Sequence, residues 1–260
     1  MGNPKLHIVK IGGNVIDNEE VLLSFLADFS KLDGLKILVH GGGKKATEMA
    51  NKLLLAPKMI GGRRITDTAN LEVVTMVYAG LLNKNIVAKL QQNNCNAIGL
   101  SGADGNTIKA HKRIVKDIDY GFAGDVDFVN TETISLLLNA NLTPVFCAIT
   151  HNKRGQLLNT NADTIASELA SALAEIYQVS LTYIFEKKGV LRNINDEDSV
   201  IENIDLDRYK LLKSDGIIAD GMLPKLKNCF NALGKGVSEI HIANTNFITD
   251  KNTQHTILSL

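Results

Sequence analysis

The chain has 260 residues, of which 45% are hydrophobic and 22% are charged, and its 28 lysines and arginines balance 28 aspartates and glutamates. The formal net charge of zero argues against a broad nucleic-acid-binding surface, because such a surface needs an excess of basic residues to displace phosphate counterions. No apolar run reaches the roughly 20 residues of a membrane span, and the first residues lack the apolar centre of a signal peptide, so we expect a cytoplasmic protein.

Strands and helices are predicted to alternate along the first 100 residues. Leu6–Ile11 is typical of a buried strand, and Glu19–Lys31 has apolar residues at helical spacing. The further elements expected here are a strand at Lys36–His40, a helix at Lys44–Leu54, a hairpin or loop at Lys58–Ile65, a long helical region at Asp67–Gln92 with a break near Gly80, and a short strand at Ala97–Leu100.

The same alternation continues to the end of the chain. We expect irregular β-hairpins at Thr107–Val126, helices at Thr131–Ala140, Ala162–Leu173, Leu206–Ser214 and Met222–Leu233, and strands at Thr143–Ile149, Val179–Phe185 and Glu239–Ala243. Strands that are apolar on both faces and alternate with helices predict an α/β fold with a mainly parallel sheet covered on both sides. No Pro-, Ser- or charge-rich linker divides the chain, so two lobes would form one continuous domain, with an approximate boundary at residues 175 and 176.

Two glycine clusters each follow a buried strand directly. They are Lys10-Ile11-Gly12-Gly13 and Val39-His40-Gly41-Gly42-Gly43. Ligands of parallel α/β sheets bind beyond the carboxyl ends of the strands, and glycines there let backbone N–H groups approach phosphate oxygens. The first cluster matches neither the Walker A nor the GxGxxG pattern. A single cluster of this kind is equally consistent with a ligand site and with an ordinary strand-end turn. Two of them favour a ligand site.

Three further motifs place polar residues near predicted element ends. Arg64 follows two glycines in Gly61-Gly62-Arg63-Arg64, and its planar guanidinium suits a carboxylate. Asn159 and Asp163 flank a helix start, where ordinary capping accounts for Thr160 or Asn161 but not for all these polar residues. Lys225 lies in the first turn of a helix, where the helix dipole disfavours a cation. A solvated side chain remains the alternative for Arg64 and Lys225.

In this order and spacing, the motifs KIGG, VHGGG, GGRRIT, NTNAD and DGMLPK resemble the amino-acid kinase family, and within it the N-acetylglutamate kinases. The resemblance extends from Lys10 to about Asn244. It implies an open αβα sandwich in which residues 1–175 bind an N-acyl-glutamate and residues 176–260 bind ATP.

The resemblance also implies roles for individual residues. Lys10 and Lys225 would stabilise the transferring phosphoryl group, with Asp163 holding the two lysines in place. The acyl-glutamate would be bound by Gly42, Gly43, Arg64 and Asn159. The phosphates would lie on Gly12 and Gly13, and the nucleotide would be lined by Glu186, Lys187, Lys188, Gly189, Val190, Leu191, Ile217, Ile218 and Ala219. Related kinases usually have aspartate at the position of Glu186 and a less basic stretch than Lys187-Lys188, which weakens the assignment of the adenosine contacts.

The expected reaction is ATP-dependent phosphorylation of the γ-carboxylate of N-acetyl-L-glutamate to an acyl phosphate, a step of arginine biosynthesis. A carboxylate with a pKa of about 4.3 is already ionised at pH 7, so the reaction needs charge neutralisation and no general base. His40 is therefore interpreted as structural. No dense carboxylate cluster and no Cys or His spacing suggests a protein metal site, so Mg²⁺ is expected mainly on the phosphates. The scattered Cys95, Cys147 and Cys229 are expected to be buried thiols.

Several alternatives stay open. The acyl group could be succinyl, and the acceptor could be aspartate, glutamate, carbamate or a nucleoside monophosphate. The chain could also be a non-catalytic sensor on a kinase scaffold, although such a protein would be expected to lose one of the two lysines. We expect a homodimer that arginine does not inhibit, because the first predicted strand begins near Leu6 and the arginine-sensitive enzymes of this family carry an additional N-terminal helix.

Overall fold

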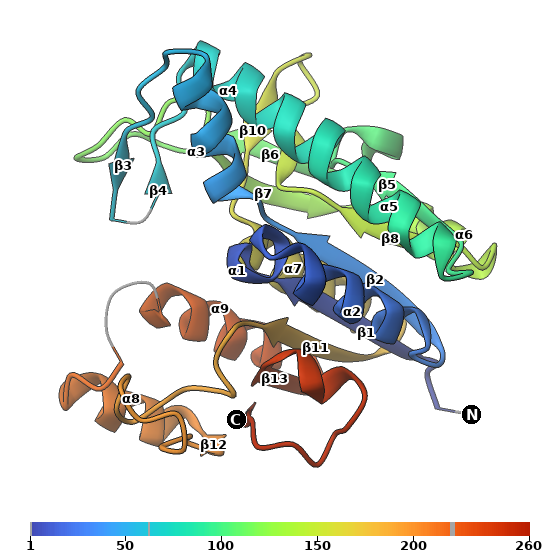
Figure 1. Cartoon of the computed structure of the whole chain (residues 1–260), viewed down its shortest axis with the longest axis vertical. Coiled ribbons are helices and arrows are strands. Elements are labelled where there is room, and N and C mark those ends of the chain that lie inside the picture. The colour runs from blue at the N-terminus through green and yellow to red at the C-terminus, as the bar shows by residue number, and fades with distance from the viewer. Residues whose placement is uncertain (1, 62, 219–221) are drawn as a thin grey trace. The chain divides into compact units, whose positions relative to one another are not determined.

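The computed structural model describes residues 2–61, 63–218 and 222–260, and it divides into two compact units (Figure 1). Unit 1 comprises Met1–Lys36 and Ala166–Leu260, and unit 2 comprises Ile37–Ile165. This division differs from the expected one at residues 175 and 176. The N-terminal segment belongs with the C-terminal part because its strand pairs along its whole length with a strand of that part.

The sheet of unit 1 contains the strands β12 (Asn203–Ile204), β14 (Thr256–Leu258), β13 (Glu239–Ala243), β11 (Gln178–Ile184) and β1 (Lys5–Ile11), in this spatial order. The pairs β1–β11 and β11–β13 are parallel, and β14 is antiparallel to β13. Leu6, Ile8 and Ile11 of β1 are fully buried, as are Leu181 and Tyr183 of β11. Such continuous burial is typical of parallel strands that are covered on both faces.

Helices pack around this sheet. They are α1 (Gly13–Asp17), α2 (Glu19–Ser30), α8 (Leu206–Ser214), α9 (Met222–Gly234), the 3₁₀ turn η3 (Thr245–Ile248) and most of α7 (Ala162–Leu173). Helix α2 begins where the Asn18 side chain accepts a hydrogen bond from the Val21 N–H at 3.2 Å. It buries Leu22, Phe25, Leu26 and Phe29, whose spacing places them on one helical face.

Unit 2 contains the parallel strands β2 (Leu35–His40), β8 (Thr143–Phe146) and β5 (Ala97–Leu100) in the order β2-β8-β5. The first two residues of β2 are assigned to unit 1, and the strand belongs to unit 2 from Ile37 onward. A second sheet has the order β10 (Leu157–Asn159), β9 (Ile149–His151), β6 (Ile108–Lys112), β7 (Gly124–Val129), and a hairpin joins β3 (Met59–Ile60) to β4 (Arg63–Arg64). The helical elements are α3 (Gly43–Lys52), α4 (Thr68–Thr75), the π-helical η1 (Met76–Leu82), α5 (Asn83–Gln92), the 3₁₀ turn η2 (Asp104–Asn106) and α6 (Thr131–Asn139). Helix α5 packs against β5, and α6 packs against β8.

The predicted α/β fold with a mainly parallel sheet is confirmed, with two local differences. Residues Thr68–Gln92 form one continuous helical run in which η1 takes the place of the expected break near Gly80. The predicted strand Thr143–Ile149 is two strands, because the chain passes from the parallel strands around β8 to the second sheet, in which β9 is antiparallel to β10 and parallel to β6.

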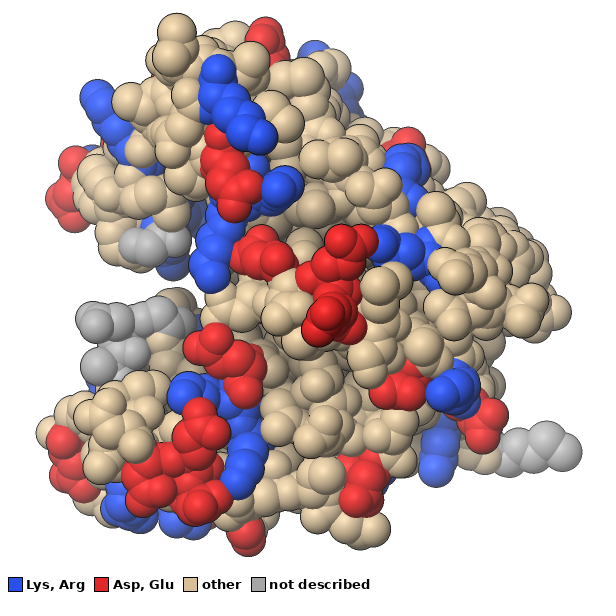
Figure 2. Space-filling view, in the orientation of Figure 1, with Lys and Arg blue, Asp and Glu red and all other residues tan. Residues whose placement is uncertain are grey.

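The distribution of charge on the surface and the burial of the cysteines are as expected from the sequence. Basic and acidic side chains are interspersed on the face shown in Figure 2, as expected for a chain of zero formal charge. All three cysteines are buried and none forms a disulfide. Within the described residues, no helix is both long and apolar enough to cross a membrane.

Candidate functional site

Two lysines from distant parts of the sequence meet on one aromatic ring in unit 1. Lys10 lies in β1, Phe185 follows the last residue of β11, and Lys225 lies in the first turn of α9. The Lys10 Nζ is 5.4 Å and the Lys225 Nζ 3.7 Å from the centroid of the Phe185 ring. Attraction between an ammonium group and the face of an aromatic ring favours this position. Two ammonium groups on one ring create a local positive field that suits an anionic ligand.

The glycines after β1 bring the backbone close to the same ring. The Gly12 N–H donates a hydrogen bond to the Ile184 carbonyl at 3.1 Å. A Cβ on Gly12 would lie 3.4 Å from a ring carbon of Phe185, so a side chain would crowd the ring. Gly13 begins α1, and the next residue, Asn14, donates a hydrogen bond from its side-chain amide to Glu186. The carboxylate of Glu186 is thereby fixed beside the glycines.

The predicted nucleotide segment after Glu186 has clear structural partners. The Lys187 Nζ lies 2.7 Å from Glu197, and the Lys188 Nζ lies 2.6 Å from Asp198. These hydrogen bonds raise the pKa of both lysines. Both ammonium groups are therefore engaged by the loop that follows β11, and their contact with a nucleotide stays a prediction.

The other predicted nucleotide residues belong largely to the core of unit 1. A Cβ on Gly189 would lie 2.6 Å from Thr256 Oγ1, so only glycine fits between its neighbours. Three of the remaining residues, Val190, Leu191 and Ile218, are at most 9% exposed. The Ile217 N–H donates a hydrogen bond to the Leu212 carbonyl, and Ala219 lies outside the described residues.

A second cluster of predicted residues lies in unit 2 around Arg64. The Arg64 side chain is buried, and its Nη2 donates hydrogen bonds to the Gly43 carbonyl at 3.0 Å and to Thr47 Oγ1 at 2.6 Å. Its Nη1 is also buried and forms no hydrogen bond with any of the described residues. A buried donor without an acceptor costs about 1–3 kcal/mol, more when it is charged, so it is typical of a site built for a ligand.

Tyr78 packs against both Arg64 and the glycine loop. Burial raises the pKa of the Tyr78 hydroxyl, and the Arg64 guanidinium opposes this rise. Gly42 has a φ of 151°, and a Cβ there would overlap Leu82 and lie 3.1 Å from the Tyr78 ring. Glycine at residue 42 is therefore required both by its backbone conformation and by the close approach of η1.

Asn159 is connected to the segment that follows the strand of Arg64. Its Nδ2 donates a hydrogen bond to Thr66 Oγ1 at 3.0 Å, and its N–H donates to the Phe122 carbonyl at 2.9 Å. Thr66 is fully buried, and its own N–H donates to the Tyr120 carbonyl. This network fixes Asn159 and the segment after β4 within one unit.

His40 has the structural role expected from the sequence. Its Nδ1 lies 2.8 Å from the Gly41 carbonyl, and its Nε2 accepts a hydrogen bond from Asn83 Nδ2 at 3.1 Å. Burial lowers the pKa of His40 to about 4, so the ring is neutral at pH 7 with its proton on Nδ1. The neutral ring ties the glycine loop to α5.

Asp163 is the second residue of α7, in the part of this helix that belongs to unit 2. The Asn161 side chain accepts hydrogen bonds from the N–H groups of Asp163 and Thr164, at 2.8 and 3.1 Å. Asn161 therefore caps the helix, so capping does not account for the presence of Asp163. No group of three or more His, Cys, Asp or Glu residues that could hold a metal ion occurs among residues 2–61, 63–218 and 222–260.

Sequence reasoning missed four residues that shape the two clusters: Asn14, Thr47, Tyr78 and Phe185. Phe185 could have been found, because it directly follows a buried strand whose carboxyl end lies beside that of β1. Thr47 is one helical turn after Gly43, but a threonine in a helix carries no such signal by itself. Tyr78 and Asn14 act through tertiary contacts that no local pattern indicates.

Known proteins resemble this chain in sequence and in fold. The pattern of the amino acid kinase family matches residues 5–244. The chain is 57% identical over 239 residues to the acetylglutamate kinase of Cytophaga hutchinsonii, with 92% of this chain and 90% of the relative covered. It is 54% identical to that of Phocaeicola vulgatus, covering 92% and 93% of the two chains. Among solved structures, the protein smu.665 from Streptococcus mutans superposes with a TM-score of 0.79 at 26% identity, covering 98% of each chain. The chain therefore belongs to the amino acid kinase family.

Proposed function

We propose that the protein is an acetylglutamate kinase, which transfers the γ-phosphoryl group of ATP to the γ-carboxylate of N-acetyl-L-glutamate in arginine biosynthesis. The name of its relatives at 57% and 54% identity supports this substrate. The observation that carries the proposal is the placement of Lys10 and Lys225 against the single ring of Phe185. A sensor on a kinase scaffold would have no need for this pair of cations.

The two lysines answer the main difficulty of the reaction. An anionic carboxylate must approach an anionic phosphate, and catalysis of such transfers depends on positioning and charge stabilisation. Lys10 and Lys225 would stabilise the transferring phosphoryl group, and the turn formed by Gly12 and Gly13 would cradle the β- and γ-phosphates. Asp163 would keep the lysines charged and oriented.

The cluster around Arg64 would bind the acyl-glutamate. Its Nη2 is committed to Gly43 and Thr47, and its buried Nη1 supplies a donor for a ligand carboxylate. Gly42, Gly43 and Asn159 would contact the rest of the ligand. Because Thr47 and the Gly43 carbonyl orient the guanidinium, the arginine would be preorganised for binding.

ATP would arrive with Mg²⁺ held mainly by its own phosphates, since Mg²⁺ prefers phosphate oxygens and water to all-protein cages. The ion would supply additional charge neutralisation at the phosphates. The segments 186–191 and 217–219 would line the nucleotide.

The decisive experiment measures ADP release with four acceptors side by side: N-acetylglutamate, N-succinylglutamate, glutamate and aspartate. We expect the highest kcat/KM with N-acetylglutamate and little turnover with either free amino acid, which lacks the acyl group. A preference for N-succinylglutamate would correct the acyl group and leave the reaction unchanged. Preference for a free amino acid, or no ADP release with any acceptor, would refute the proposed function.

We also propose a cytoplasmic homodimer. The dimer is supported by large apolar side chains that remain exposed on the helical run of unit 2, with Met76 54% and Leu81 41% exposed. Exposed apolar groups on one element are typical of surfaces between subunits. The cytoplasmic location is supported by the use of ATP in a biosynthetic reaction.

A further inference from the structure

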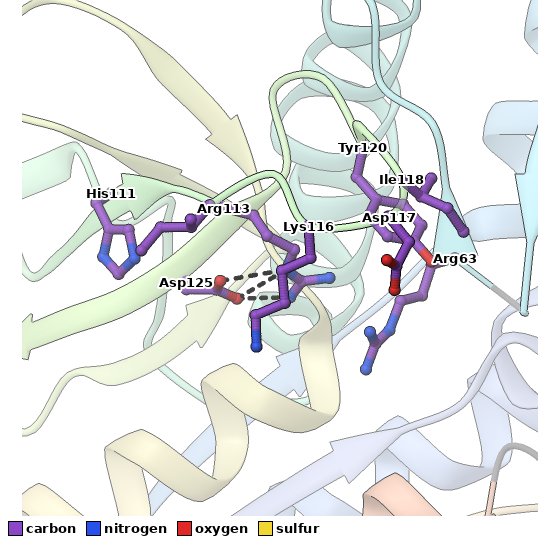
Figure 3. A pocket seen from close by; sticks show the side chains of 9 residues that line it. Arg63, His111, Arg113, Lys116, Asp117, Ile118, Tyr120 and Asp125 are labelled. Carbon is purple, nitrogen blue, oxygen red and sulfur yellow. Dashed lines mark hydrogen bonds and ion pairs between the residues drawn. The ribbon is translucent and has the colours of Figure 1, made fainter.

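A pocket of about 510 Å³ lies in unit 2 between the β3–β4 hairpin and the connection from β6 to β7 (Figure 3). Its volume is in the range of pockets that hold small molecules. It is lined by Arg63, His111, Arg113, Ile114, Lys116, Asp117, Ile118, Tyr120 and Asp125. The resemblance and the proposed function assign a role to none of these residues.

Two of the basic side chains in this pocket already have acidic partners. The Arg113 guanidinium forms hydrogen bonds of 2.5 and 3.1 Å with Asp125, and they raise the pKa of Arg113. Arg113 also lies over the Tyr120 ring, at 5.7 Å from its centroid. His111 Nδ1 lies 2.6 Å from Asp127. The Arg113–Asp125 pair forms part of the pocket wall and contributes little net charge, and Asp127, whose partner His111 is charged only when protonated, is not among the lining residues.

Arg63 and Lys116 remain as cations whose side chains form no hydrogen bond or ion pair with any residue in the described part of the chain. Figure 3 shows both side chains extending from the backbone toward the same side of the pocket, with Asp117 beside them. Arg63, Lys116 and Asp117 together leave one excess positive charge. A charge of this sign and size suits a single carboxylate better than a dianionic phosphate.

The pocket also offers apolar surface. Ile114 is 72% exposed, which is high for an isoleucine, and Ile118 and Tyr120 are only partly buried. Apolar walls with a few converging polar groups are the usual composition of small-molecule sites.

The base of the pocket is fixed to the strand segment that follows β4. The Thr66 N–H donates to the Tyr120 carbonyl at 3.0 Å, and the Phe122 N–H donates to the Thr66 carbonyl at 2.7 Å. Between them, Gly121 has a φ of 66°, and a Cβ there would overlap the Thr66 carbonyl. The side chain of Tyr120 is therefore held in place by a backbone contact that requires glycine at residue 121.

This pocket is separate from the cluster around Arg64. Successive side chains of a β-strand point to opposite faces. Arg64 is buried against Gly43 and Thr47, whereas its neighbour Arg63 is exposed and lines the pocket. One strand thus presents one arginine to each site.

We propose that the pocket binds a small organic carboxylate. The carboxylate pairs with Arg63 and Lys116, and its apolar body lies against Ile114, Ile118 and Tyr120. The guanidinium of Arg63 supplies a two-pronged contact, and the Lys116 ammonium adds a point charge.

Methyl-detected NMR of the whole chain with labelled isoleucines tests this proposal, with phenylacetate as the probe at constant ionic strength. We expect saturable shifts of the Ile114 and Ile118 methyl signals. Phenylacetamide has the same ring and no charge, and it should bind much more weakly.

The double variant Arg63→Gln/Lys116→Gln should raise the Kd for phenylacetate by about tenfold or more, because two charge-assisted contacts are lost. The matched control Lys153→Gln/Arg154→Gln removes the same charge from the exposed β9–β10 turn, and it should leave the Kd unchanged. Equal weakening in both double variants would show a general charge effect and overturn the proposal.

The remaining outcomes are also decisive. Absence of saturable shifts, equal binding of phenylacetamide, or tighter binding of inorganic phosphate would each overturn the proposed ligand class. Loss of binding in Arg64→Lys but not in the Arg63/Lys116 double variant would place the ligand in the other cluster. Because the readout is binding, it does not depend on whether the protein has kinase activity.

Discussion

At the scale of single residues, Lys10 and Lys225 carry the chemistry that we propose. Each lysine acts most strongly on charge that rearranges in the transition state, so Lys10→Ala and Lys225→Ala should lower kcat far more than they raise the KM for ATP. A loss of about 10²–10³ in kcat is typical when one such donor is removed. Steady-state kinetics with N-acetylglutamate measures the effect, with the exposed Lys31→Ala as control. Near-normal kcat in either variant would remove that lysine from the mechanism.

Arg64 offers a test of substrate binding with a control on the same strand. Arg64→Lys keeps the charge but cannot keep hydrogen bonds to Gly43 and Thr47 while reaching a ligand, so the KM for the acyl-glutamate should rise by about tenfold or more. The KM for ATP should change little. Arg63→Lys, the same substitution on the opposite strand face, should leave both KM values near normal. A rise in the KM for ATP alone would assign Arg64 to the nucleotide.

His40 links the glycine loop to the pH dependence of stability. Its pKa of about 4 in the folded chain is below the ordinary 6.5, so the unfolded chain binds a proton more readily. Stability should therefore fall as pH decreases from about 6.5 toward 4, by up to about 3 kcal/mol from this group. Thermal unfolding between pH 7.5 and about 4.5 should show a shallower pH dependence in His40→Gln than in the wild type. If Tm changed with pH equally in the two proteins, titratable groups other than His40 would dominate the pH dependence of stability.

At the scale of elements, the start of α3 depends on a glycine that cannot be replaced. Gly42 has a φ of 151°, and an added Cβ would overlap Leu82 of η1, so Gly42→Ala should lower Tm by several degrees and weaken acyl-glutamate binding. Gly43→Ala is the matched control for stability, since its Cβ would meet no atom within 4 Å and alanine favours a helix. Differential scanning calorimetry compares the two. If Gly42→Ala lowered Tm by no more than Gly43→Ala does, the role assigned to the close approach of Leu82 would be contradicted.

Long elements with a strong apolar pattern could be predicted from the sequence, whereas short ones could not. The strands β1 and β11 and the helix α2 were predicted to within one or two residues, because their apolar residues are continuous or helically spaced. The elements α1, β10, β12 and β14 were missed, since each has five residues or fewer and is held by tertiary pairing. The strand from Thr143 was predicted as one element because nothing local shows that the chain changes sheets after Phe146.

The same limit applies to the two clusters. The motifs indicated Lys10 through a glycine cluster at the end of a buried strand, Arg64 through the glycines before it, and Lys225 through its place in the first turn of a helix. Thr47, the partner of Arg64, could not be predicted, since its role depends on which elements become neighbours in three dimensions. The sequence pattern therefore indicates the charged groups of a site, and the fold determines what orients them.

At the scale of the whole molecule, the proposed homodimer can be tested through the exposed apolar residues of η1. Met76 and Leu81 are five residues apart, the hydrogen-bond spacing of a π-helix, so their side chains lie on the same side of η1. In the proposed dimer both side chains would be buried between the subunits, and the double variant Met76→Asp/Leu81→Asp would place charges there. It should therefore be a monomer of 28.2 kDa, whereas the wild type should have twice that mass. Light scattering coupled to gel filtration measures the mass. Leu54→Asp is the control, because Leu54 is 94% exposed after α3 and should leave the dimer intact. A monomeric wild type would refute the dimer, and a double variant that stays dimeric would place the interface on another surface.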